Sequence, residues 1–224
     1  MPNTSATYPS TVTGGSATAD GSWSNVSNAL TDNGSYASSP LLTIVSPTIS
    51  FTNFLFSIVG TPSGIVAEIK RYANISSSSG GGGRIVDDAV ILLNGTGTPE
   101  SKAFTSTANR WPLLASVAYK TYPSSGTNDL WGLTFTSTQV NSSSFGLRLT
   151  CVGNRLDGTE QGFVDTVRIT VYYTAAAATL FRLNRLRKGS RGFHRNIPMY
   201  TDGSGLLLPS LDMVTLSQTR AVSC

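Results

Sequence analysis

Three aspartates are the residues whose type and spacing could support catalysis: the adjacent pair Asp87 and Asp88, and Asp165. Two carboxyl groups held roughly 5 to 9 Å apart across a cleft could hydrolyse a glycosidic bond, and oxygen-rich loops could hold Ca²⁺. Adjacent residues of a strand point to opposite faces of the sheet, so Asp87 and Asp88 cannot share one site. We therefore predict solvated carboxylates at strand ends and a protein that is not an enzyme.

Other reactive side chains are scarce, because the sequence holds one histidine and two cysteines. This composition excludes a histidine-rich metal site, a zinc ribbon and a disulfide scaffold, and we expect neither metal nor cofactor. His194 has arginines nearby and no indicated nucleophile, so we interpret it as a surface or docking residue. Cys151 lies on the apolar face of a predicted strand and is expected to be buried. Cys224 is expected to be a free thiol.

The aromatic side chains suggest a second kind of chemistry, because rings that line a groove can stack on sugar faces. Trp131 and Tyr119 are the candidates for such a contact. The alternative, which we favour, is that the tryptophans fill the ends of a β-sandwich core. The aromatic residues considered are Trp23, Tyr36, Trp111, Tyr119, Tyr122, Trp131, Tyr172 and Tyr173.

Residues 76–83 are four serines followed by four glycines. A glycine-rich loop can cradle a phosphate, but neither the Lys-Ser/Thr pair nor the helix that such loops require follows this tract. We therefore predict a flexible hairpin tip.

Short apolar runs separated by Gly, Pro, Asn and Ser predict an all-β, antiparallel sandwich. Alternation is clearest at residues 144–152, where Phe145, Leu147, Leu149 and Cys151 share one face. Residues 166–174 alternate in the same way. Earlier strands are predicted at 49–59, with Phe54, Phe56 and Ile58 on one face, and at 64–73 and 86–93. Weaker candidates are 115–122 and 132–137.

Charge and composition together divide the chain into three parts. Residues 175–224 hold seven Lys and Arg against two Asp and Glu, whereas the rest of the chain holds nine against ten. Residues 1–22 are mostly Thr, Ser, Gly and Ala, which bury too little apolar surface to offset the entropy of ordering. We predict a flexible or partner-ordered arm over 1–22, a β-sandwich domain over 23–174 and a basic docking extension over 175–224.

The docking extension combines leucines with cations. Its apolar residues need a surface to cover them, so we expect it to pack on another subunit or to wrap its own sandwich. Its cations would meet acidic patches on a partner. A protein partner is favoured over nucleic acid, since no nucleic-acid-binding motif is present. We expect no signal peptide, no transmembrane segment and a soluble product. The predicted docking residues are Leu180, Phe181, Arg182, Leu183, Arg185, Leu186, Arg187, Lys188, Arg191 and Arg195.

Several stretches, taken in order, resemble β-sandwich virion proteins of tailed bacteriophages. The first begins at Trp23 and carries Asn, Ala, Asp, Gly, Tyr and Ala in sequence. The match covers about residues 23–174 and leaves out the basic extension. The stretches that carry the resemblance are residues 23–37, 64–69, 86–92, 128–133, 144–147 and 164–173.

This resemblance implies a jelly-roll-like sandwich that decorates or cements the capsid, neck or tail of a virion. It implies a homo-oligomer, with a trimer favoured, and contacts with other virion subunits. It carries no catalytic residue onto this chain. The alternative is a host-recognition tail appendage in which Trp131 or Tyr119 stacks on a cell-surface glycan.

Overall fold

The computed structural model of the chain describes residues 2–15, 18, 20–43, 45–75, 85–123, 128–153, 160–175, 199–201 and 207–209. The chain divides into two compact units, Met1–Ala175 and Ala176–Cys224. In the second unit the described residues form one antiparallel pair, β9 (Met199–Thr201) with β10 (Leu207–Pro209).

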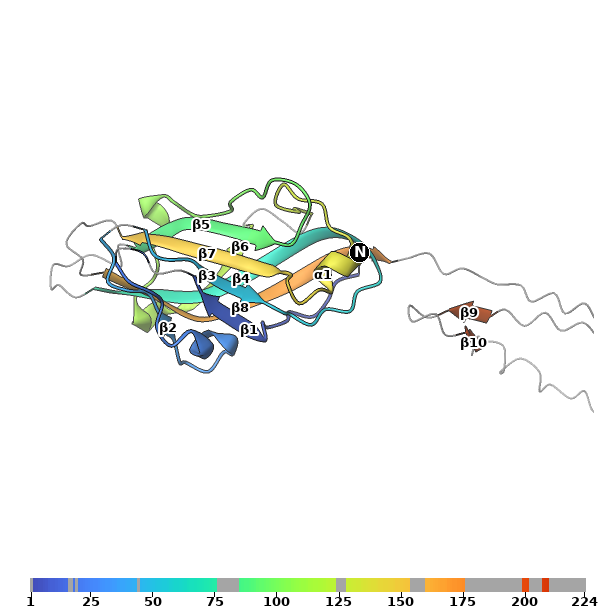
Figure 1. Cartoon of the computed structure of the whole chain (residues 1–224), viewed down its shortest axis with the longest axis horizontal. Helices are drawn as coiled ribbons and strands as arrows, with labels where there is room; N and C mark the ends of the chain where they lie inside the picture. The colour runs from blue at the N-terminus through green and yellow to red at the C-terminus, as the bar shows by residue number, and fades with distance from the viewer. Residues whose placement is uncertain are drawn as a thin grey trace, which may run out of the picture. The chain divides into compact units, whose positions relative to one another are not determined.

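The first unit is built from two antiparallel four-stranded sheets, which confirms the all-β prediction (Figure 1). The first sheet has the order β1 (Thr11–Gly14), β3 (Ile49–Thr52), β7 (Gly146–Gly153), β5 (Ile85–Leu93). The second sheet has the order β2 (Ala37–Ser38), β8 (Glu160–Ala175), β4 (Gly60–Ile75), β6 (Ala118–Tyr122).

Consecutive strands of this unit lie in different sheets. Odd-numbered strands β1 to β7 form the first sheet and even-numbered strands β2 to β8 form the second, so each connection crosses from one sheet to the other. The hairpin predicted at residues 76–83 is therefore wrong, because β4 and β5 do not pair with each other. The tract itself lies outside the described residues.

The core lies between the sheets and follows the predicted alternation. Phe145, Leu147, Leu149 and Cys151 are all buried on the inner side of β7 or just before it, and Cys151 is a free thiol. On β8 the side chains of residues 167, 169 and 171 are buried as well. Side chains with period 2 that face each other across two sheets are the core of a sandwich.

The strand predicted at 49–59 ends early. β3 stops at Thr52 because Asn53 and Leu55 adopt left-handed backbone angles, with φ values of 58° and 55°. A left-handed residue cannot continue a strand. The aromatic residues Phe54 and Phe56 are nevertheless buried, and they pack around Phe145.

The two weaker strand predictions differ more from the structure. In the range predicted as a strand, 132–137, Gly132 has a left-handed φ of 72°. The range ends at Ser137, where the single-turn helix α1 (Ser137–Val140) begins. Thr136 and Gln139 form a capping box at its start, a Thr-x-x-Gln signature that is visible in the sequence. At 115–122 the strand is only β6, preceded by the 3₁₀ turn η3 (Leu114–Ser116).

The N-terminal segment is ordered against both sheets, so the prediction of a flexible arm over residues 1–22 differs from the structure. Thr11–Gly14 forms β1 and pairs with β3. Upstream, Thr4 and Thr7 bond to β8, with Thr7 N and Ile169 O 2.9 Å apart. Backbone hydrogen bonds to two strand edges offset the ordering entropy that its small side chains cannot offset by burial.

The opposite side of the sandwich is closed by the segment between β5 and β6. Lys102 N donates to Val90 O at 2.9 Å, and Trp111 N donates to Ile85 O at 2.8 Å, so this segment follows the β5 edge. It then crosses to the second sheet, where Ala73 N donates to Pro112 O at 2.8 Å. The segment therefore covers the β5 edge and connects it to β4 of the second sheet.

Helical structure is minor in the described part of the chain. Besides α1 and η3, it consists of the 3₁₀ turns η1 (Val26–Leu30) and η2 (Thr107–Asn109). Within the described ranges, no helix has the length and apolar character to cross a membrane.

Strands β3 and β7 approach each other closely at Gly146. A Cβ at this position would lie 1.9 Å from the carbonyl oxygen of Phe51. We expect Gly146→Ala to lower the free energy of unfolding by about 3 kcal/mol, because the backbone of β3 must move. Urea denaturation measures the change. Gly34→Ala is the control: its site is open and only its φ of 72° is unfavourable, so a loss of about 1 kcal/mol is expected. Equal losses of stability in the two variants would show that the backbone of β3 does not exclude a side chain at residue 146.

Candidate functional site

The predicted docking residues do not fall within the part of the chain that the structure describes. Leu180, Phe181, Arg182, Leu183, Arg185, Leu186, Arg187, Lys188, Arg191 and Arg195 lie outside the described residues, as do His194 and Cys224. Among the described residues, two charged clusters of the sandwich contain the buried aspartates.

Asp87 and Asp88 are separated by a β-bulge, and only one of them meets solvent. Asp87 pairs with Cys151 and Ala89 pairs with Thr150, so Asp88 is the extra residue of β5. Asp88 is exposed and accepts a hydrogen bond from the Thr150 hydroxyl at 2.8 Å. Asp87 is fully buried. The two carboxylates face opposite sides as expected, but the prediction that both are solvated is wrong.

The Asp87 carboxylate accepts hydrogen bonds from three groups inside the sandwich and forms an ion pair with a fourth. Trp111 Nε1 donates to one oxygen at 2.8 Å, and Arg71 forms an ion pair with the same oxygen. The Tyr122 hydroxyl and Phe104 N donate to the other oxygen at 2.8 and 3.0 Å. A buried carboxylate needs such partners, because desolvation without them would cost several kcal/mol.

Arg71 carries the opposite charge and is itself buried. Its guanidinium lies 4.7 Å from the ring centroid of Trp111 and 5.5 Å from that of Tyr122, within cation–π range. Burial lowers the pKa of Arg71 to about 10, so the group remains charged at neutral pH. Burial also raises the pKa of the neighbouring Cys151 thiol to about 12. The Arg71–Asp87 cluster therefore links β4 of the second sheet to β5 of the first through a paired charge.

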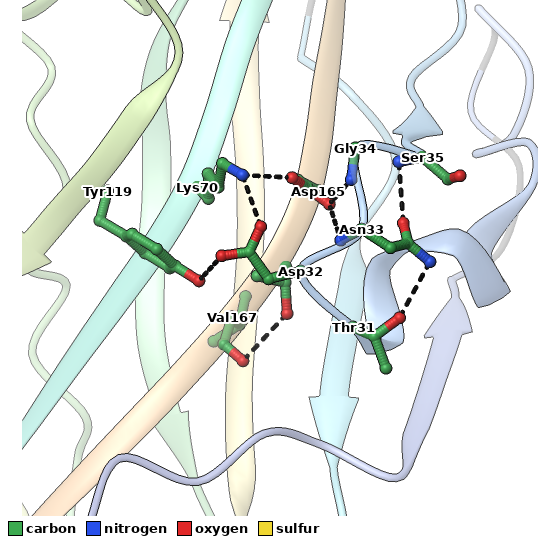
Figure 2. Close-up of polar contacts among 10 residues, drawn as sticks. Thr31, Asp32, Asn33, Gly34, Ser35, Lys70, Tyr119, Asp165 and Val167 are labelled. Carbon is green, nitrogen blue, oxygen red and sulfur yellow. Dashed lines mark hydrogen bonds and ion pairs between the residues drawn. The ribbon is translucent and has the colours of Figure 1, made fainter.

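A second cluster lies on the outer side of the second sheet (Figure 2). Lys70 Nζ of β4 contacts Asp32 at 2.5 Å and Asp165 at 2.8 Å. The Tyr119 hydroxyl of β6 donates to the other oxygen of Asp32 at 2.8 Å. We call Asp32, Lys70, Tyr119 and Asp165 the outer cluster.

Asp165 reaches this cluster because β8 is bulged. Lys70 pairs with Thr166 and Arg71 pairs with Val164, so Asp165 is the unpaired residue between them. Its carboxylate is buried, which contradicts the prediction of a solvated strand end. The reason is a turn that covers it: Asn33 N and Gly34 N both donate to Asp165 Oδ1 at 3.3 Å (Figure 2).

The electrostatics of the outer cluster favour structure over nucleophilic chemistry. Hydrogen bonds to Asp165 and Asp32 raise the pKa of Lys70 above its ordinary value. Hydrogen bonds from Lys70 and Tyr119 lower the pKa of Asp32. Burial, reinforced by hydrogen bonds with Tyr8 and Asp32, raises the pKa of Tyr119. A lysine held in its charged form has no lone pair for attack on a substrate.

Two further residues extend the same face. Arg168 of β8 donates two hydrogen bonds to the carboxylate of Glu68 on β4, from Nε at 2.7 Å and from Nη2 at 3.0 Å. Its Cζ also lies 4.0 Å from the ring centroid of Tyr119. A bidentate pair that stacks on a ring holds the three strands β6, β4 and β8 in register.

The tryptophans are not available for stacking on a ligand in this structure. Trp131 and Trp111 are buried, and Trp131 Nε1 donates to Ile65 O at 2.9 Å. The proposal that Trp131 stacks on a glycan is therefore wrong, and burial agrees with the favoured alternative that tryptophans belong to the core. Tyr119 stays half-buried on the outer face.

No sequence prediction placed Arg71, Lys70 or Asp32 in a charged cluster, and none identified the turn over Asp165. One signal was present: Arg71 follows Ile65, Ala67 and Ile69 at period 2, which places it on the buried face of β4. A buried arginine requires a buried acid, and Asp87 is that acid. The bulges that aim Asp87 and Asp165 have no comparable sequence signal.

Comparisons with known proteins add no homologue. No protein-family model matches this chain, no curated protein matches its sequence, and no solved structure matches its fold. Within the described ranges, no group of three or more His, Cys, Asp or Glu residues could hold a metal ion. Functional inference therefore depends on the residues and charges of this chain.

Asp87→Asn tests the buried pair. Removing one charge leaves Arg71 buried without a counter-ion, so we expect the free energy of unfolding to fall by about 3 to 5 kcal/mol. Asp88→Asn is the matched control on the same strand, and it should change stability by less than about 0.5 kcal/mol, since the residue is exposed. Chemical denaturation of both variants measures the difference. Similar losses of stability in the two variants would show that Arg71 does not depend on Asp87 as its buried counter-ion.

Asp32→Asn tests the outer cluster through pH. The folded-state pKa of Asp32 lies below its unfolded value, so its stabilising contribution is present above pH 4 and is lost as pH falls through the folded pKa. We expect the variant to be less stable than the wild type at pH 7 and to lose less stability on acidification from pH 4 to 2. Tyr119→Phe removes one donor and should give an intermediate slope. Parallel pH profiles for all three proteins would contradict this role.

Proposed function

We propose that this protein is a virion structural protein of a tailed bacteriophage. Its β-sandwich, which we propose to be jelly-roll-like, supplies the body of the module. The basic extension attaches this body to other virion subunits, so that the protein decorates or cements the capsid, neck or tail. The proposal includes a homo-oligomer, with a trimer favoured.

The separation of charge between the two units is the observation that carries this proposal. The boundary after Ala175 coincides with the change from a near-neutral body to a strongly basic segment. In the body, Asp87 is neutralised by Arg71, and Asp32 and Asp165 share Lys70. Charges that are paired within the fold contribute little to docking, whereas seven cations with only two acids attract an acidic partner surface.

The sandwich itself supports a structural role. The Asp87 carboxylate receives three hydrogen-bond donors, forms an ion pair with Arg71 and is closed to solvent, so it is poorly suited to proton transfer with a substrate. Alternation of the strands between two sheets ties each part of the body to both layers. A rigid body with a charged, leucine-bearing segment is the composition expected of an attachment module.

Deletion of residues 176–224 tests the attachment role. We expect the truncated chain to keep the thermal unfolding transition of the sandwich, because its buried residues lie in Met1–Ala175. We expect incorporation into phage particles, measured by co-sedimentation and immunoblotting, to fall at least tenfold. A triple variant, Arg182→Glu, Arg185→Glu and Arg187→Glu, should show the same loss through charge reversal.

Arg148→Glu provides the control, because it reverses an exposed cation on β7. It should leave incorporation unchanged. Incorporation of the truncated chain at the wild-type level would overturn the proposal. Binding of the truncated chain to a glycan array, lost on Tyr119→Ala, would instead favour the host-recognition alternative.

A further inference from the structure

The N-terminal segment, residues 2–15, is attached to the sandwich in a way that suits exchange between molecules. We infer that this segment is an exchangeable strand, and that in the oligomer it lies on the β8 and β3 edges of a second copy of this chain. The inference concerns contacts between copies of the protein and does not depend on its proposed place in a virion.

Most of the hydrogen bonds to β8 are made by the main chain. Tyr173 N donates to Pro2 O at 3.2 Å, and Thr4 N donates to Val171 O at 3.0 Å. Thr7 and Ile169 exchange two hydrogen bonds, each of 2.9 Å. Between these pairs, Val171 N donates to the Thr4 hydroxyl at 3.0 Å. These bonds extend the second sheet beyond the short strand β2, which covers β8 only at Phe163 and Val164.

The segment then crosses to the first sheet. Ser10 N donates to Asn53 O at 3.0 Å, and β1 pairs with β3 over its four residues. Beyond β1, Gly15 N donates to Thr48 O at 2.5 Å. One segment therefore supplies the edge strand β1 of the first sheet and pairs through isolated bridges with β8 of the second.

Burial contributes little to this attachment. In residues 2–15 the side chain of Pro9 alone is buried, and Val12 is partly buried against the core. The remaining side chains are exposed or partly exposed and are mainly Ser and Thr. Segments with few buried apolar contacts open at low free energy, well before the rest of a fold unfolds. The core strands β4, β7 and β8, by contrast, bury several large side chains each.

Opening of the segment leaves two unpaired strand edges, and the same segment of a second copy fits them best. An unpaired edge tends to pair with another strand. The second copy would restore each bond in the same register, including the Thr4 hydroxyl and the Pro9 and Val12 contacts. Exchange of an identical element is a low-cost route to an oligomer for this reason.

Disulfide trapping tests the exchange in the full chain. Asn3 and Tyr172 lie opposite each other, and the bonds that flank them mark a non-hydrogen-bonded pair. The Cα atoms of such pairs are about 4.5 Å apart, within disulfide range. The background is Cys224→Ser, since Cys151 is buried. Asn3→Cys and Tyr172→Cys chains are mixed, refolded together and oxidised. We expect a disulfide-linked dimer containing one of each chain, by intact mass spectrometry.

Val66→Cys mixed with Thr170→Cys is the matched control. These residues also face each other, on β4 and β8, but both strands are internal to the body and should not exchange. We expect at least tenfold less linked dimer from this mixture. The double variant Asn3→Cys and Tyr172→Cys in one chain should oxidise almost completely. Equal dimer yields from the two mixtures, or a double variant that does not oxidise, would overturn the inference.

A synthetic peptide of residues 2–15 provides a second measurement. Labelled peptide incubated with the full chain should be captured in competition with the chain's own segment. A peptide carrying Thr7→Pro lacks the N–H that bonds Ile169 O and should be captured at least tenfold less. Capture of both peptides to the same extent, or of neither, would contradict an exchangeable strand. Because both tests use the isolated protein, their failure leaves attachment through residues 176–224 unaffected.

Discussion

A buried pair of opposite charges connects the two sheets of this protein. Arg71 projects from β4 and Asp87 from β5, and each is removed from water by the core around it. Either charge alone would be strongly destabilising, so the sandwich depends on keeping both in place. Trp111 and Tyr122 complete the arrangement, since each donates to Asp87 and places its ring beside Arg71. The segment between β5 and β6 is consequently held along the β5 edge, where Trp111 N also bonds the backbone.

Alternation of the strands between sheets gives the fold few local pairings. Each strand finds its neighbours far along the chain, so both sides of the sandwich must be closed by segments that cross from sheet to sheet. On one side this segment carries Trp111 and its bonds to the core. On the other side the N-terminal segment is held mainly by backbone hydrogen bonds. This difference in burial gives the two sides different stabilities and makes one side suitable for contacts between copies.

Charge has a different purpose in the two units. Within the sandwich, Asp87 is paired with Arg71 of the other sheet, and the two acids of the outer cluster share Lys70. The outer cluster also holds the turn at Asn33 and Gly34. The second unit keeps an excess of cations without an equal number of acids. A near-neutral body whose buried charges are paired and a segment with an excess of cations are the physical basis for proposing attachment through that segment.

The amino-acid sequence predicts the all-β class, the inner faces of β7 and β8 and the burial of Cys151, because alternation over a regular strand needs no knowledge of its partner. It also placed Arg71 in phase with buried residues, a signal that pointed to a buried acid. The tertiary structure alone decided that Asp87 and Asp165 are buried, since each lies at a bulge that exists only against a partner strand. It likewise decided that Thr11–Gly14 is a strand, because hydrogen bonds to distant edges order that segment and its own side chains do not.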